Sequence, residues 1–158
     1  MHKKENLIRF YEGTPKLLIR RIINRQNRLS VGYTDKKLVF KKDINPFIPI
    51  DKRFSSKYLL AILASKLISY LYINISSIAT KDDFRQTTLT ELRELPIIIP
   101  DEKDESLIID LVDKILKLKK NTKSSNTSII ESEIDKMVYN LYDLTDEEIK
   151  IIENSENG

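Results

Sequence analysis

Short β-type patterns fill the first third of the chain. Residues 16–23 form a β-branched run, residues 28–34 alternate between apolar and polar side chains, and residues 37–41 form a further apolar run after a turn. Prolines then interrupt the chain, so residues 47–50 are expected to form a loop or an edge strand. Together these segments predict a small, mostly antiparallel sheet.

A nearly continuous apolar segment follows the predicted sheet. Residues 58–75 are apolar on almost every face of a helix, and Ser55 or Ser56 is placed to cap its first turn. The segment is about as long as a membrane span, but Lys66 lies near its centre, where a charge is costly in a bilayer. We therefore expect a buried central helix that packs under the sheet.

Beyond this segment the pattern becomes helical. Residues 92–95 predict a short turn of helix, and residues 97–100 predict a buried strand between two prolines. Residues 101–120 begin with acidic and end with basic side chains, which the helix macrodipole favours. Residues 128–141 carry a matching apolar stripe after a predicted capping box at residues 128–131. Two such helices joined by a short polar loop predict an antiparallel hairpin.

The tail combines a turn with a capped helix. Asp143 lies at the turn, residues 145–148 form a second predicted capping box, and the last helix is expected to end near residue 153. The chain therefore predicts an α+β fold, a small mostly antiparallel sheet with a central buried helix, followed by a C-terminal antiparallel helical hairpin. Its expected parts are a β-rich part over residues 1–100 and a helical part over residues 101–158.

The charge is distributed unevenly along the 158 residues. The net charge is +3, yet residues 1–60 contain 15 Lys and Arg against 5 Asp and Glu, whereas residues 61–158 contain 12 against 19. A basic first part beside an acidic remainder favours a polyanion, nucleic acid above all, as the partner of the first part. A basic face that is simply solvated is the alternative.

The composition also excludes several kinds of catalytic site. The chain has no cysteine and one histidine, His2, so it lacks thiolate zinc sites, cysteine nucleophiles and histidine triads. Its three glycines form no phosphate-binding loop. One enzymatic alternative is a minimal metal-dependent nuclease that uses Glu12 with Asp35-Lys36-Lys37, although a hairpin turn is the simpler interpretation of that triplet.

Basic and amide side chains gather in three segments of the chain. Arginine forks suit guanine edges and phosphates, Asn and Gln suit adenine edges, and lysines suit phosphates, so these segments are the predicted DNA contacts. They comprise Arg20, Arg21, Arg25, Gln26, Asn27 and Arg28 at the first strand connection, Lys36, Lys37, Lys41 and Lys42 at the second, and Lys81, Arg85 and Gln86 after the central helix.

The order of these elements resembles a known family. The basic start is followed by Leu59-Leu60-Ala61-Ile62-Leu63-Ala64-Ser65-Lys66-Leu67-Ile68-Ser69-Tyr70, then Leu92-Arg93-Glu94-Leu95-Pro96-Ile97, then Tyr139-Asn140-Leu141-Tyr142-Asp143-Leu144-Thr145-Asp146-Glu147-Glu148. Over about residues 15–153 this order resembles the TaqI-like C-terminal specificity domain of restriction-modification enzymes, and is similar to type I specificity subunits. Ala64 departs from the Asn that members often have, and Asp143 departs from a common Gly, although Asp tolerates the left-handed conformation.

The resemblance implies a DNA target recognition domain over residues 1–100 and a spacer or docking hairpin over residues 101–158. Its partners would be double-stranded DNA and a methyltransferase or endonuclease catalytic domain, in cis or in trans, in the cytoplasm of a bacterium or archaeon and with no membrane. The chain has no Asn/Asp-Pro-Pro-Tyr/Phe methyltransferase motif. No cofactor is therefore expected in this chain, while the parent adenine-N6 methyltransferase would use S-adenosylmethionine, and Mg²⁺ if it cleaves DNA. A helical-hairpin adaptor for protein association is the alternative function.

Overall fold

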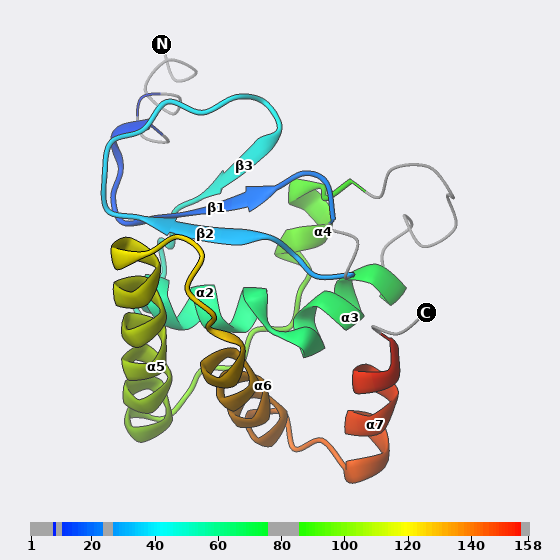
Figure 1. Cartoon of the computed structure of the whole chain (residues 1–158). Coiled ribbons are helices and arrows are strands. Elements are labelled where there is room, and N and C mark those ends of the chain that lie inside the picture. The colour runs from blue at the N-terminus through cyan, green and yellow to red at the C-terminus, as the bar shows by residue number, and fades with distance from the viewer. Residues whose placement is uncertain (1–7, 9–10, 24–26, 76–85, 156–158) are drawn as a thin grey trace.

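The computed structural model describes residues 8, 11–23, 27–75 and 86–155. A three-stranded antiparallel sheet lies on one side of a group of helices (Figure 1). Strand β1 (Lys16–Arg20) lies between β2 (Val31–Thr34) and β3 (Ile44–Phe47). The predicted α+β fold class is confirmed.

The sheet buries one face against the helices. Leu17 and Ile19 of β1 are buried on that face, and their partners across β2 are Tyr33 and Val31. In β3, Pro46 lies opposite Leu18. Proline is tolerated there because β3 is an edge strand, so the missing N–H breaks no inner hydrogen bond of the sheet.

One strand prediction in this region is wrong. Residues 37–41 do not form a strand but part of the loop that joins β2 to β3. For residues 47–50, expected to form a loop or an edge strand, the loop is confirmed at residues 48–50, because edge strand β3 already ends at Phe47. Strand β1 pairs with β2 on one side and β3 on the other, and residues 37–41 cross from the end of β2 to the start of β3 outside this sheet.

The apolar segment forms two helices rather than the predicted one. Helices α2 (Ser56–Ala64) and α3 (Lys66–Ile75) meet at Ser65 with a bend of 61°. The Ser65 hydroxyl donates to the carbonyl of Ile62 at 2.7 Å and accepts from the N–H of Ile68 at 3.3 Å, so it serves both helix ends. Among the described residues no single helix is long and apolar enough to cross a membrane, whereas the bent pair meets those two criteria together.

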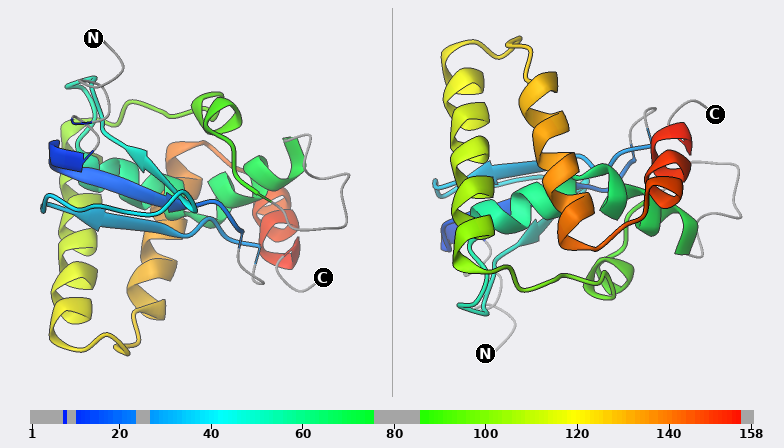
Figure 2. Two further views of the ribbon diagram at one scale, coloured as in Figure 1. Left: turned by 90° about the horizontal axis from the view of Figure 1, so that it is seen from above. Right: turned by 90° about the horizontal axis from the view of Figure 1, so that it is seen from below.

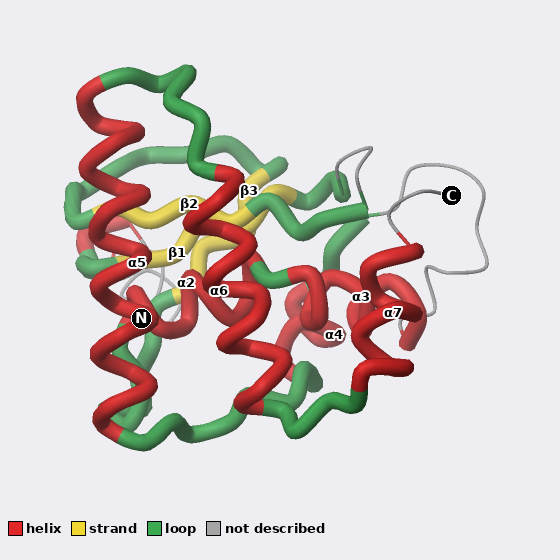
Figure 3. The backbone as a smooth tube through the Cα atoms, turned by 60° about the horizontal axis from the view of Figure 1, so that its bottom comes forward, coloured by secondary structure: helices red, strands yellow, loops and turns green. Residues whose placement is uncertain are grey.

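Helices α5 to α7 pack on the bent helix pair α2 and α3, on its side away from the sheet (Figures 1 and 2). Helices α5 (Glu102–Asn121) and α6 (Ser128–Leu141) form the predicted hairpin, and α5 packs on α2. Helix α7 (Asp146–Asn154) packs on α3 beside α6 (Figure 3). Buried residues of the sheet, of α2 and α3, and of the hairpin form one core. The predicted parts, residues 1–100 and 101–158, therefore share one core, and their separate roles in function stay a prediction.

Local capping signals decide how the tail folds. Thr145 and Glu148 form the predicted capping box of α7, and Asp143 adopts the predicted left-handed conformation with φ of 50°. The N–H of Leu144 donates to the carbonyl of Tyr139, which closes α6 in a Schellman arrangement. The capping box expected at residues 128–131 is wrong, because Thr127 is the N-cap and its hydroxyl donates to the Glu131 carboxylate.

The segment after α4 (Leu89–Arg93) is extended but unpaired, so the buried strand predicted at residues 97–100 is also wrong. Tyrosine hydroxyls satisfy its carbonyls in place of a neighbouring strand. Tyr58 donates to the carbonyl of Ile98 at 2.8 Å, and Tyr142 donates to that of Pro96 at 2.6 Å. The segment is thereby fixed to α2 and to the end of α6.

Alkaline pH is expected to destabilise the fold through buried Tyr72. Burial raises the pKa of Tyr72 from 10.0 to about 12, and its hydroxyl donates to Glu91 and accepts from the N–H of Thr88. Because the folded pKa lies above the unfolded one, this stability is fully present below pH 10 and is lost as pH rises toward 12. The loss is about 1.4 kcal/mol for each pH unit.

Urea unfolding at pH 9, 10 and 11 measures this loss. The Tyr72→Phe variant, which has no proton to release at this position, is expected to lose stability less steeply above pH 10 than the wild type. Equal slopes for the two proteins would show that Tyr72 does not contribute.

Candidate nucleic-acid interface

The end of β1 brings together two of the three predicted basic segments. A bridge pairs Ile22 with Gln86, and the side chain of Thr87 donates to the carbonyl of Arg20 at 3.1 Å. Nη2 of Arg21 donates to Oε1 of Gln86 at 3.1 Å, across 65 residues of sequence. The side chains of Arg21 and Gln86 are therefore neighbours, although the sequence placed them in separate groups.

The loop that enters β3 adds lysines to the same end of the sheet. The N–H of Arg21 donates to the carbonyl of Asp43 at 2.9 Å, and Arg20 lies opposite Ile44 in the sheet register. Lys41 and Lys42 directly precede these contacts and are exposed. We call this set the basic end of the sheet, and it consists of Arg20, Arg21, Lys41, Lys42 and Gln86.

The backbone beneath the basic end is firmly held. Thr87 is buried, and its N–H donates to the carbonyl of Arg21. The side-chain amide of Asn45 in β3 donates to Oγ1 of Thr87 at 3.1 Å. Main-chain and buried side-chain contacts thus position this end, while Arg20 and Gln86 are exposed to solvent.

The other two lysines of the second predicted group lie at the opposite end of the same loop. The N–H of Lys36 donates to Oγ1 of Thr34 at 3.1 Å. Nζ of Lys37 lies 3.8 Å from Oε1 of Glu12, and both side chains are largely exposed. Among the described residues, no three His, Cys, Asp or Glu side chains come together as a metal site. The carboxylate of Glu12, which the nuclease alternative paired with Asp35, contacts the ammonium group of Lys37.

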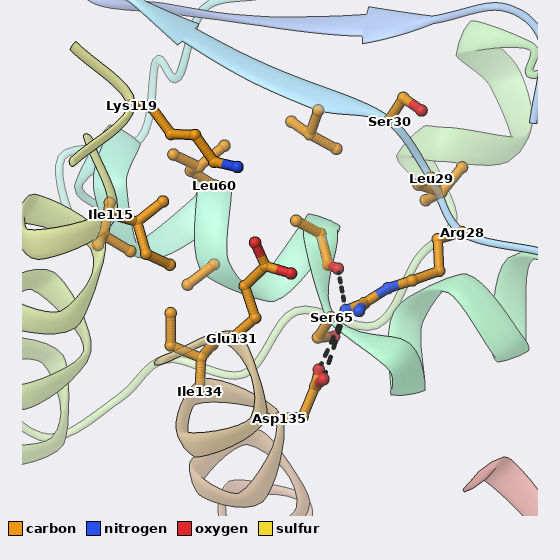
Figure 4. A pocket seen from close by; sticks show the side chains of 14 residues that line it. Arg28, Leu29, Ser30, Leu60, Ser65, Ile115, Lys119, Glu131, Ile134 and Asp135 are labelled. Atoms are coloured by element: carbon orange, nitrogen blue, oxygen red, sulfur yellow. Dashed lines mark hydrogen bonds and ion pairs between the residues drawn. The ribbon is translucent and has the colours of Figure 1, made fainter. Parts of the chain in front are cut away.

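The side chain of Arg28 lies at the junction of α2 and α3 (Figure 4). Its Nη2 donates to the carbonyl of Ala64 at 2.8 Å and lies 3.4 Å from Oδ1 of Asp135. Asn27, which precedes it, is half-buried with φ of 56°. The remaining predicted contacts, Arg25, Gln26, Lys81 and Arg85, lie outside the described residues.

The junction joins four parts of the chain through polar contacts. Oδ1 of Asp135 on α6 accepts from the N–H of Lys66 at 2.9 Å, and Nζ of Lys66 contacts Glu153 of α7 at 2.6 Å. Arg28 thus places a cation at the C-terminus of α2, and Asp135 places an anion at the N-terminus of α3, as both helix dipoles prefer. Burial raises the pKa of the Asp135 carboxyl.

A pocket of about 370 Å³ opens beside this junction, between β2, α2 and the hairpin (Figure 4). Its apolar lining includes Leu60 and Ile115, and its polar lining includes Arg28 and Asp135. Those polar groups already serve the fold, because the two charges contact each other. The sequence pattern did not single out Asp135. The sequence feature that could have identified it is the spacing: Asp135 lies three and four residues before the buried residues Val138 and Tyr139, and so on the same face of α6.

Comparison with known proteins places the chain in a family. A model of the family described as the TaqI-like C-terminal specificity domain matches residues 1–97. That range includes the sheet, the bent helix pair and every residue of the basic end. The chain is also 44% identical, over 166 aligned residues, to a putative type II restriction enzyme and methyltransferase of Methanocaldococcus jannaschii. The alignment covers 99% of this chain and 14% of that relative. The chain therefore belongs to the TaqI-like C-terminal specificity domain family.

Proposed function

We propose that the chain recognises a specific sequence in double-stranded DNA on behalf of a restriction-modification enzyme and is itself non-catalytic. The observation that carries this proposal is the hydrogen bond between Arg21 and Gln86, which joins two distant basic segments. An arginine fork beside a side-chain amide offers donors for guanine edges or phosphates and a bidentate partner for adenine. Lys41 and Lys42 add charges for the flanking phosphates.

The ordered positions of these side chains support sequence-specific readout of DNA rather than non-specific electrostatic binding. Binding costs less when the contacting groups are already ordered, and an element fixed by buried contacts orders them. Arg20 and Arg21 extend from the end of a three-stranded sheet, and Gln86 is fixed beside them through buried Thr87. These contacts give the donors a defined spacing before DNA arrives.

The proposed catalytic partner lies outside this chain. The relative is named as both a restriction enzyme and a methyltransferase, and this chain spans 14% of its length. We therefore assign methyl transfer from S-adenosylmethionine to adenine N6, and any Mg²⁺-dependent cleavage, to the rest of such an enzyme. Recognition of the site would hold the duplex while the catalytic part extrudes its target base. Residues 101–158, which hold helices α5 to α7, contain 15 Asp and Glu against 8 Lys and Arg, so this part would face that partner and not the DNA.

The test is duplex binding by the 158-residue chain across a range of salt concentrations. A duplex enriched from a randomised library should bind on the order of 10³ times more tightly than its scrambled counterpart. The logarithm of the binding constant should fall linearly with the logarithm of salt concentration, by about 0.9 for each phosphate contact. Equal affinity for enriched and scrambled duplexes would exclude sequence recognition, and absence of any binding would favour the protein-association alternative.

A further inference from the structure

The loop between β2 and β3 exposes apolar side chains between two lysine pairs. Residues 35–43 form this loop, in which Lys36 and Lys37 precede the apolar residues, and Lys41 and Lys42 follow them. The side chain of Val39 is 88% exposed, and that of Leu38 is 40% exposed. The loop arches beyond the sheet on the side opposite the helices (Figure 1).

The loop is anchored along its length, which makes this exposure a property of the fold. Its first turn is closed by the bond from Lys36 to Thr34, and its end is tied to β1 through the carbonyl of Asp43. Between these points the ring of Phe40 packs on Tyr11, with the ring centroids 4.9 Å apart. Phe40 therefore turns toward the protein, while Val39 is almost fully exposed and Leu38 is partly exposed.

The chemistry of the loop matches that of the DNA major groove. That groove is about 12 Å wide and admits a two-stranded ribbon, and its walls are lined by phosphates that lysines can contact. The apolar group that a base pair presents there is the 5-methyl group of thymine. A tip of two aliphatic side chains between two pairs of lysines has the complementary arrangement of charge and apolar surface.

We propose that Leu38 and Val39 contact thymine 5-methyl groups in the major groove, with the lysine pairs on the flanking phosphates. This inference rests on the proposed function and adds a base-specific element to it. The basic end of the sheet would supply hydrogen bonds to base edges. The loop would add an apolar contact to the thymine methyl group, which hydrogen bonds do not read, to the donor and acceptor pattern of the base edges.

Deoxyuridine substitution tests this contact, since it removes the methyl group and keeps the base pair. Each thymine of the enriched duplex is replaced in turn, and dissociation constants are measured for the wild type and for the Leu38→Ser, Val39→Ser double variant. At a contacted position the wild type should bind about fourfold more weakly for each methyl group removed. The double variant should bind both duplexes equally. Ile129→Ser, at a residue 77% exposed on α6, is the matched control and should behave as the wild type.

The outcomes separate this inference from the proposed function. Specific binding that no deoxyuridine weakens, or that it weakens equally in the double variant, would overturn the methyl contact and leave sequence recognition intact. A rise in the fluorescence of 2-aminopurine placed in the site, lost in the double variant, would replace groove contact with insertion between bases. Failure to enrich any duplex would overturn the proposed function, and the inference with it.

Discussion

Replacing Asp135 with alanine is expected to lower the free energy of unfolding by about 3–5 kcal/mol, which is the cost of removing one partner of a buried ion pair. The variant removes the carboxylate that Nη2 of Arg28 contacts, in a site where the Arg28 side chain is 20% exposed. It also removes the acceptor for the N–H of Lys66 at the start of α3. Denaturant unfolding followed by circular dichroism measures the change.

Two further variants separate burial from charge. Asp113→Ala breaks the surface ion pair with Lys57, in which the two side chains are 48% and 32% exposed, and should cost at most about 1 kcal/mol. Asp135→Asn should cost less than Asp135→Ala, because burial already raises the pKa of Asp135 and so disfavours its charged form, and because asparagine keeps an acceptor for Lys66. Equal losses for Asp135→Ala and Asp113→Ala would show that the junction does not hold the fold together.

Features set by neighbouring residues could be predicted from the sequence. The capping box at Thr145 and Glu148, the left-handed turn at Asp143 and the cap at Ser55 each depend on atoms within four residues. The bend between α2 and α3 could not be predicted in the same way. Its helix ends are satisfied by Arg28 and by Asp135, and the latter lies 69 residues beyond Lys66. A run of apolar residues carries no sign of such distant partners.

The same limit applies to the candidate interface. Charge alone placed Arg20, Arg21 and Arg28 in one predicted group, but it could not show which guanidinium the fold itself engages. The structure places Arg28 against Ala64 and leaves Arg20 exposed. Gln86 lies beside Arg21 because a β-bridge joins Ile22 to Gln86. Helices α2 and α3 lie between these two positions in the sequence, so the sequence pattern gives no sign of this bridge. Composition predicts a basic surface, and tertiary contacts decide which of its members lie together.

The Arg20→Ala, Arg21→Ala double variant is expected to weaken binding to the enriched duplex while its folding is unchanged. Each arginine that binds a base edge contributes about 1–3 kcal/mol, and removing an arginine that binds a phosphate reduces the salt slope by about 1. Binding curves for the enriched and scrambled duplexes at several salt concentrations distinguish the two roles. Weaker binding confined to the enriched duplex indicates base readout, whereas equally weaker binding to both duplexes indicates phosphate binding.

Arg53→Ala is the matched control for this variant. Arg53 is exposed and pairs with Asp51 at 2.6 Å, beyond the opposite end of β3 from the basic end. Its removal should leave both affinity and salt slope close to the wild-type values. Arg21→Lys sharpens the result further, since it keeps the charge and removes the planar fork that reads guanine bidentately. If Arg53→Ala weakened binding as much as the double variant, net charge alone would govern binding. Retention of specificity by Arg21→Lys would move base readout from Arg21 to another residue.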